Sequence, residues 1–391
     1  MRNREALRRE LLEQIEHIGA WEAEDPEILQ MIDELVLEHG RKECWSLEEK
    51  QEIRQELFYS VRKLDVLQEL VEDDEVTEIM VNGWEQIFVE RRGRITLWEK
   101  TFTSQEKLWD VIQQIAAGCN RVINTSRPIV DARLKNGARV NAVIEPVALN
   151  GPILTIRRFP DHPITMEDLI AGNSITREGA ECLIQMVRQK HSMLIGGGTG
   201  AGKTTFLNAL SCYIPSEERI VTIEDNAELQ IQGITNLVRL EAKLSNLEDS
   251  PQITIRDLIK TALRLRPDRI IIGEVRSSEA VDLLQAVNTG HEGSLSTAHA
   301  NSAADMVSRL ETMVLMGIQL PLEAIRRQIA AGFDILIHLG RMPDKSRAVL
   351  EITEITGISQ GEVCLHPLFI RRNGERLEKV GEPMGKRKGG I

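Results

Sequence analysis

The spacing of apolar and polar positions changes along the chain and divides it into stretches. In the first stretch, residues 1–70, apolar side chains recur with helical spacing and charged side chains fill the other faces, which predicts amphipathic helices. A second helix is expected to start at Asp25-Pro26, and Ser46 and Glu49 have the spacing of a capping box for a third. The apolar face of the first helix consists of Leu7, Leu11, Ile15 and Ile18. This helical N-terminal appendage either packs on the next domain or docks on a partner, and the pattern leaves both open.

The second stretch, residues 71–159, has the shorter alternation of β-strands around a single helix at 105–117. Asn-Gly and Arg-Gly pairs mark turns between the segments. The expected strands are residues 78–81, 86–89, 94–97, 138–143 and 153–159. The pattern predicts a small α+β domain.

Pro160 and Pro163 mark an expected linker at residues 160–175, and beyond it strands and helices alternate. The expected strands are 193–195, 220–223, 270–272 and 294–297, and the expected helices are 178–189, 203–210, 256–265 and 278–288. Such alternation predicts an α/β fold over residues 176–370, with a parallel-rich sheet covered by helices on both faces. Residues 371–391, with Lys386, Arg387 and Lys388, are expected to form a basic flexible tail.

Composition narrows the classes of function. With 391 residues, the chain has room for two or three domains. Its formal net charge of −12 disfavours nonspecific binding to nucleic acid or anionic lipid, so no direct nucleic-acid contact is expected. The five cysteines form no CxxC pair, which argues against zinc. No apolar run approaches the ~18 residues of a membrane span and the start is charged rather than signal-like, so a cytoplasmic protein is expected.

The most specific motif is GGTGAGKT at residues 197–204, which follows the apolar run Met193 to Ile195. Glycines let the backbone curl around phosphates with its N–H groups pointing inward, and the following helix adds its positive end. Lys203 is expected to reach the β- and γ-phosphates, and Thr204 to give its hydroxyl to Mg²⁺. The expected nucleotide-binding residues are Gly197, Gly198, Thr199, Gly200, Ala201, Gly202, Lys203, Thr204 and Thr205. The sequence therefore predicts a site for a nucleoside triphosphate and Mg²⁺.

Three polar clusters follow predicted strands of the same sheet. They contain Glu224, Glu274 and His299, each of which is expected at the carboxyl end of a strand, where open α/β sheets bind ligands. A carboxylate there often only caps a helix, but behind a phosphate-binding loop it can hold Mg²⁺ through water or orient the attacking water. Because Gly273 rather than an aspartate directly follows its strand, Glu274 is expected to carry the metal role together with Thr204.

The small α+β domain carries a dense set of arginines for so acidic a chain, namely Arg133, Arg139, Arg157 and Arg158. On strands such residues usually form a solvated face. Near a phosphate site they would neutralise the charge of a transferring phosphoryl group.

Taken together, these motifs resemble those of a known family. Residues ~70 to ~340 are similar to the secretion ATPase superfamily that powers type II and type IV secretion and type IV pili, and most similar to the CpaF-type ATPase of tight-adherence (Tad/Flp) pilus assembly. The matching motifs are VTEIMVNG, VDARLKNGARVNAVI, LTIRRF, GGTGAGKTT, IVTIEDNAELQI, LRLRPDRIIIGEVRSSEAVDLLQAVNTGHEGSLSTAHANS and SRLETMVLM. The resemblance implies a RecA-like ATPase domain, preceded by a PAS-like α+β domain.

The resemblance also implies roles for residues. It assigns Lys203 and Thr204 to the Walker A loop, Glu224 to the Asp box, Glu274 to the Walker B segment and His299 to the His box. It does not decide which glutamate is the catalytic base. Family members form hexameric rings in which arginines of the N-terminal domain approach the nucleotide across a mobile linker, and the matching candidates are Arg133, Arg139 and Arg157.

The expected function is ATP hydrolysis by a cytoplasmic homo-hexamer that powers Tad/Flp pilus assembly or protein secretion through an inner-membrane platform, with membrane association through partners. The alternatives are a conjugation or type IV secretion ATPase, a nucleic-acid motor, and a non-hydrolysing nucleotide-gated scaffold. The chain lacks the tetracysteine insert of many type II and pilus-extension relatives, which favours the CpaF-like or conjugation-type branches. The exported substrate, the direction of work and the platform protein stay open.

Overall fold

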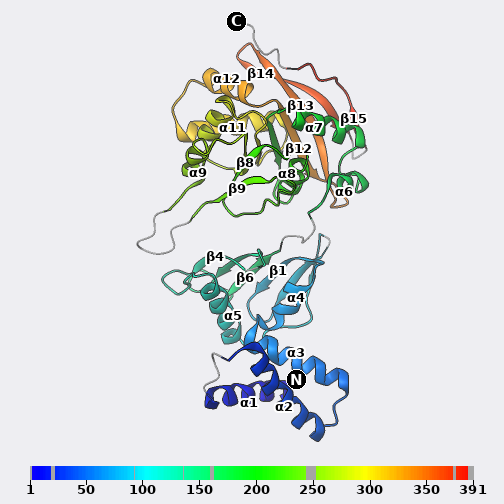
Figure 1. Ribbon diagram of the computed structural model, residues 1–391, viewed down its shortest axis with the longest axis vertical. Coiled ribbons are helices and arrows are strands. Elements are labelled where there is room, and N and C mark those ends of the chain that lie inside the picture. Colours follow the sequence, from blue (N-terminus) through cyan, green and yellow to red (C-terminus); the bar gives the residue numbers. More distant parts are fainter. Residues whose placement is uncertain are drawn as a thin grey trace. The chain divides into compact units, whose positions relative to one another are not determined.

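The chain divides into two compact units, residues 1–161 and 162–391 (Figure 1). The computed structural model describes residues 2–18, 23–91, 93–134, 136–158, 163–243, 252–372 and 376–385. Among these residues, no helix combines the length and the apolar character that a bilayer crossing requires.

The first unit begins with a helical bundle. Its helices are α1 (Arg2–Ile18), α2 (Asp25–Lys42) and α3 (Leu47–Arg62), followed by the 3-10 turn η2 (Asp65–Leu67) and α4 (Gln68–Glu72). Ser46 and Glu49 form the predicted capping box, each bonding the backbone N–H of the other. The buried side chains of the bundle are Leu7, Leu11, Ile15, Ile28, Ile32, Leu35, Val36, Ile53 and Leu57.

The bundle packs on the small α+β domain of the same unit, which is one of the two arrangements that the sequence left open. Lys107, on the helix of that domain, is only 8% exposed. Its Nζ donates to the Ser60 carbonyl at 2.6 Å and lies 3.4 Å from the Asp65 carboxylate. A buried ammonium is tolerated because these oxygens surround it.

The small domain is a six-stranded antiparallel sheet with the order β3-β2-β1-β6-β5-β4 and one helix, α5 (Gln105–Gly118). The strands are β1 (Val76–Asn82), β2 (Ile87–Arg91), β3 (Arg94–Leu97), β4 (Ile129–Arg133), β5 (Arg139–Val143) and β6 (Ile153–Arg157). Alternate residues of β5 and β6 are buried against α5, so the sheet has an inner and an outer face. The sequence missed β4, and Phe159, the expected end of β6, lies outside the described residues.

The second unit is built on a nine-stranded sheet with the order β15-β14-β13-β12-β7-β11-β10-β8-β9. From β12 to β9 every neighbouring pair is parallel, and from β12 to β15 every pair is antiparallel. The strands are β7 (Met193–Gly197), β8 (Arg219–Glu224), β9 (Asn236–Glu241), β10 (Arg269–Val275), β11 (Leu295–Ala298), β12 (Ile335–Arg341), β13 (Arg347–Ser359), β14 (Glu362–Arg371) and β15 (Leu377–Lys379). The predicted parallel-rich α/β fold is confirmed.

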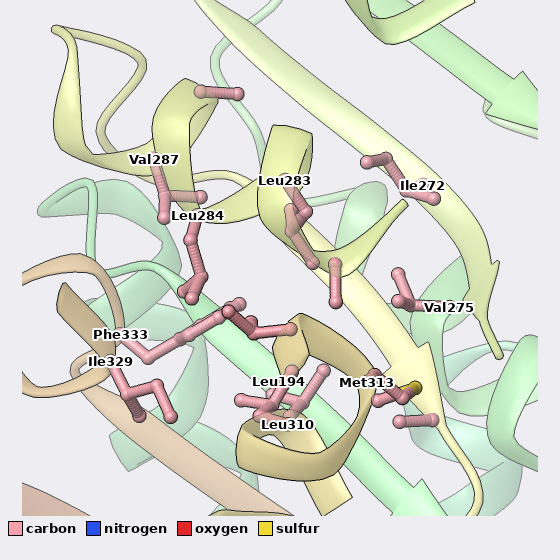
Figure 2. Close-up of a cluster of buried hydrophobic side chains, with 14 of the residues drawn as sticks. Leu194, Ile272, Val275, Leu283, Leu284, Val287, Leu310, Met313, Ile329 and Phe333 are labelled. Atoms are coloured by element: carbon pink, nitrogen blue, oxygen red, sulfur yellow. The ribbon is translucent and has the colours of Figure 1, made fainter. Parts of the chain in front are cut away.

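Helices cover both faces of this sheet. One core contains side chains of α6 (Met166–Ala171), α7 (Arg177–Arg188) and α8 (Lys203–Ser211). The opposite core contains side chains of α9 (Ile255–Ala262), α10 (Ala280–Asn288), α11 (Ala303–Gly317) and α12 (Leu322–Gly332). Figure 2 shows Leu283 and Leu284 of α10, Leu310 of α11 and Phe333 gathered over Leu194 and Ile272 of the sheet.

Two predicted boundaries need correction. Residues 166–171, inside the expected linker 160–175, form α6, and Met166 is buried in the core. Arg371 ends β14, and Leu377–Lys379 pairs with that strand as β15, so the start of the expected tail 371–391 belongs to the sheet. Lys386, Arg387 and Lys388 lie outside the described residues, as does Pro160.

Candidate functional site

The phosphate-binding motif forms a tight loop between β7 and α8. Gly200 and Gly202 adopt φ values of 67° and 88°, which L-residues with a side chain rarely tolerate. A Cβ on Gly197 would lie 2.6 Å from the carbonyl oxygen of Leu339 on β12. Thr204 and Thr205 lie in the first turn of α8, where backbone N–H groups have no intrahelical acceptor. The predicted nucleotide-binding residues therefore lie together, in a loop whose backbone favours glycine at residues 197, 200 and 202.

Lys203 is folded back across this loop and is 8% exposed. Its Nζ donates to the carbonyl oxygens of Gly197 and Gly198 at 3.1 and 3.2 Å. The same nitrogen lies 3.9 Å from Glu274 Oε1 and 3.5 Å from His299 Nδ1. The loop thus holds a desolvated positive charge next to the predicted carboxylate and histidine, which suits it to bind phosphate.

Glu274 lies near the end of β10 among three cationic or titratable neighbours. Arg276 donates to its Oε2 from Nε at 2.7 Å and from Nη2 at 2.5 Å. Its Oε1 is buried and accepts no hydrogen bond of good geometry from the described residues, although His299 Nε2 lies 2.8 Å away. This oxygen therefore retains the capacity to bind a water molecule or a cation.

His299 directly follows β11. Burial, and then the Lys203 cation, lower the pKa of its imidazole below the ordinary value, and the opposing attraction of Glu274 is smaller. The side chain is therefore mostly neutral at neutral pH. A neutral imidazole can donate through one nitrogen and accept through the other.

Glu224 ends β8 and is 3% exposed. Its Oε1 accepts hydrogen bonds from the backbone amides of Glu228 and Leu229, each at 2.8 Å. Burial nevertheless raises the pKa of this carboxyl to about 7, because the loss of hydration outweighs the two amides. A carboxyl that titrates near neutral pH can accept a proton from water and release it again.

The donor set fits the Mg²⁺ that a nucleoside triphosphate requires. Mg²⁺ prefers oxygen ligands and keeps several waters, and it is often held by one or two carboxylates plus phosphates. The Thr204 hydroxyl at the start of α8 and the buried Oε1 of Glu274 are oxygen ligands of this type.

Sequence reasoning missed two arginines at the loop, Arg341 and Arg347, which end β12 and begin β13. Both donate through Nε to the carbonyl oxygen of Gly200, at 3.4 and 2.9 Å. They are also cross-strand partners, so two like charges face each other across the hairpin. No motif marks them, because their approach to the loop depends on the pairing of β12 with β7.

The structure also holds the segment after Glu224 in place from two sides. Asn208 of α8 accepts a hydrogen bond from the Gln230 amide at 3.0 Å. Arg239 of β9 donates to the Leu229 carbonyl at 2.8 Å. The segment that bonds Glu224 is therefore tied to the helix that follows the phosphate loop.

The three arginines predicted on the small domain form one row across its sheet. Arg133 of β4 pairs with Arg139 of β5, and Arg139 pairs with Arg157 of β6. Directly paired residues of antiparallel strands point to the same face, here the outer face. The row continues to Glu78 of β1. The structure brings the three arginines together with one another, and their action on a nucleotide stays a prediction.

Comparison with known proteins gives a consistent picture. The family model described as "Type II/IV secretion system protein" matches residues 61–362. The conjugal transfer protein TrbB of Rhizobium radiobacter is 33% identical over 308 residues, which cover 76% of this chain and 90% of TrbB. The type IV secretion system protein PtlH of Bordetella pertussis is 33% identical over 302 residues, which cover 71% of this chain and 89% of PtlH.

A solved structure of the pilus retraction motor PilT with bound ADP shares the fold. It is 19% identical, has a TM-score of 0.53, and is matched over 82% of this chain and 83% of PilT.

Proposed function

The chain belongs to the type II/IV secretion system protein family and is an ATPase, and on that premise we propose that it is a hexameric motor that powers Tad/Flp pilus assembly or protein secretion through an inner-membrane platform. The observation that carries the proposal is the convergence on one loop of Lys203, Glu274 and His299, whose polar atoms lie within 2.8 to 3.9 Å of one another. A nucleotide-gated scaffold without turnover would not need this set.

In the proposed mechanism, the loop amides and Lys203 bind the β- and γ-phosphates and orient them. Mg²⁺, when bound by Thr204 and through water by Glu274, would neutralise charge on the phosphates. Glu224 accepts a proton from the attacking water, which its pKa near 7 suits, and His299 positions groups around the γ-phosphate. Glu274 is the alternative base. Its pairing with Arg276 favours the metal role instead.

Arginines would supply the remaining positive charge. We assign this role to Arg139 and Arg157, with Arg133 beside them, once the small domain closes on the nucleotide of its own or a neighbouring subunit. Their shared row gives them one direction of approach. Arg341 and Arg347 supply positive charge from within the ATPase unit. Their two guanidinium groups share one carbonyl oxygen, so a phosphate anion nearby would stabilise them further.

The proposed setting is the cytoplasmic face of the inner membrane, where the hexamer is held by platform proteins. This assignment rests on the resemblance to secretion and pilus ATPases and on the net charge of −12, which disfavours direct binding to anionic lipid or nucleic acid.

A second candidate, a conjugation or type IV secretion ATPase, is favoured by the two relatives at 33% identity, a conjugal transfer protein and a type IV secretion protein. The two candidates share the same chemistry. They differ in the machine that uses it.

The proposal is tested first on the purified protein and then in cells. The purified chain should hydrolyse ATP with Mg²⁺ as a hexamer by native mass spectrometry, and Lys203→Ala should lose turnover while keeping its melting temperature, with Lys260→Ala as the matched control. Unimpaired turnover in Lys203→Ala would refute the site. Deletion of the gene should then abolish surface pili; loss of DNA transfer or protein export with normal pili would favour the second candidate.

A further inference from the structure

A cavity of about 260 Å³ opens on the small α+β domain. The first two turns of α5 contribute Gln105, Glu106 and Trp109, and the ends of the adjacent strands contribute Ile144, Glu145 and Pro152. Arg139 begins β5 and Arg157 ends β6, whereas the cavity lies beyond the opposite ends of these two strands. It is therefore separate from the arginine row proposed to meet the nucleotide.

The loops that form this cavity carry an unusual number of exposed apolar side chains. Leu149 is 90% exposed and Val147 is 52% exposed, and both lie between Glu145 and Pro152. Val122, which lies shortly before the lining residue Thr125, is 51% exposed. Ile129 is exposed to a similar degree. Single exposed apolar residues are normal, but several in the segments that also supply lining residues to one cavity are typical of an interaction surface.

The charged lining residues of the cavity, Glu106 and Glu145, are both acidic, and Gln105 and Thr125 add neutral polar groups. Glu106 lies in the first turn of α5, and a hydrogen bond from its own backbone amide is the main reason that its pKa lies below the ordinary value, so it is ionised at neutral pH. Within the part of the chain that the structure describes, neither Glu106 nor Glu145 forms an ion pair. The indole of Trp109 adds a ring face that attracts cations. The cavity thus offers two carboxylates and an aromatic side chain, and the segment that joins Glu145 to Pro152 adds exposed apolar side chains.

We propose that this cavity docks a basic, apolar segment from the cytoplasmic side of an integral membrane partner, with a Lys or Arg side chain between Glu106 and Glu145 and neighbouring apolar side chains on Leu149 and Val147. Cytoplasmic loops of membrane proteins carry an excess of Lys and Arg, which complements these carboxylates. The exposed Leu149 and Val147 favour segments that also carry large hydrophobic residues over merely basic ones. This inference rests on the proposed function for the nature of the partner but uses residues outside the nucleotide site.

The binding test uses the full chain without nucleotide. Fluorescence anisotropy measures the affinity of a dye-labelled peptide of Arg and Leu, with two comparison peptides that replace every Arg by Glu or every Leu by Ser. We expect only the Arg/Leu peptide to bind. The double variant Glu106→Lys/Glu145→Lys should weaken it by about tenfold or more, and Leu149→Ser should weaken it by a smaller factor.

The matched control is Glu85→Lys/Glu99→Lys, which makes the same charge change at exposed positions of the same unit. This control should leave peptide affinity within about twofold, and basal ATP turnover should be unchanged in every variant. Equal weakening in the control would overturn the proposal, since it would mean general attraction to an acidic chain. Because peptide affinity is measured without ATP, a failure of this inference is distinguishable from a failure of the ATPase assignment.

The partner is tested in cells by a photo-crosslinking residue at position 149. The expected product is a crosslink to a Lys- or Arg-rich cytoplasmic segment of an integral membrane protein, lost in the Glu106→Lys/Glu145→Lys background. A crosslink to a second copy of this chain, to a soluble protein, or to nothing would overturn the assignment.

Discussion

A Cβ on Gly273 would lie 3.0 Å from the Cγ of Glu224, the buried carboxylate that ends the neighbouring strand. Any side chain on residue 273 would therefore push Glu224 away from the amides of Glu228 and Leu229 that bond it. This contact favours glycine at residue 273, and the carboxylate of β10 is on the next residue, Glu274. The absence of a side chain at residue 273 therefore leaves room for the Glu224 side chain beside the strand that carries Glu274.

Replacement of Gly273 by alanine should lower kcat for ATP by roughly tenfold with little change in KM, because displacing Glu224, the proposed proton acceptor, would affect the chemical step more than binding. Steady-state kinetics checks this. Gly118→Ala is the control, since a Cβ there meets nothing within 4 Å. An unchanged kcat in Gly273→Ala would mean that Glu224 does not need its present position.

Glu224→Gln should retain ATP binding and lose roughly a hundredfold or more in turnover. In the wild-type protein, kcat should rise with pH through about 7, where the carboxyl loses its proton, and the variant should lack that rise. A pH profile of kcat decides between Glu224 and Glu274 as the base. If the wild-type profile is flat from pH 6 to 8, Glu224 is not the proton acceptor.

The same substitution should raise stability at high pH. The pKa of Glu224 is raised in the folded state, so the folded protein holds a proton that the unfolded chain releases, and folding stability falls as pH increases from the ordinary carboxyl value toward about 7. Glutamine stays neutral and can still accept the two amide hydrogen bonds. Its melting temperature relative to wild type should therefore be higher at pH 8 than at pH 5, and the opposite ordering would contradict the burial of this charge.

Arg139→Ala or Arg157→Ala should reduce turnover far more than ATP affinity, because charge on the phosphoryl group is spread most widely in the transition state. Arg94→Ala, on the exposed strand β3 of the same sheet, is the control. Glu274→Gln is expected to be inactive because it alters the proposed metal-binding carboxylate. If the row acts across subunits, mixed hexamers of Arg139→Ala with Glu274→Gln should regain partial activity. Wild-type rates in both arginine variants would refute the role. Inactive mixed hexamers would indicate that the arginines act on the nucleotide of their own subunit.

Arg347→Ala should weaken ATP binding by about tenfold, since a charge-assisted hydrogen bond to Gly200 that helps to hold the phosphate loop is lost. Arg347→Lys should restore part of the affinity because it keeps the charge. Arg327→Ala, which breaks an exposed pair with Glu323, is the control. ATP affinity within twofold of wild type in Arg347→Ala would show that the loop does not depend on this contact.

The sequence predicts the local parts of this site well and the long-range parts poorly. The phosphate loop is visible because its glycines are required by the backbone of those same residues, at φ values such as that of Gly202. Arg347 is not visible, because it reaches Gly200 only through the register of β12 against β7, and no local pattern encodes strand register. The same reason hides the row of three arginines, whose separate positions were predicted but whose alignment depends on pairing between strands.

Boundaries were missed where short elements gain their structure from contacts elsewhere. Helix α6 has six residues, too few for a clear helical period, and it is held by a capping box at Thr165 and Asp168 and by the burial of Met166. Strand β15 has three residues and exists because β14 provides its partners.

That short strand has a consequence for the solubility of the chain. Strand β14 is ten residues long, and its outer edge would present unpaired N–H and C=O groups to any other chain. β15 pairs with Phe369, Ile370 and Arg371, Val380 donates its amide to the Leu368 carbonyl, and the Glu382 carbonyl lies 3.0 Å from the ring of His366. The C-terminal segment thereby shields this edge against edge-to-edge aggregation, and a shortened version of the protein that ended before Leu377 would expose it.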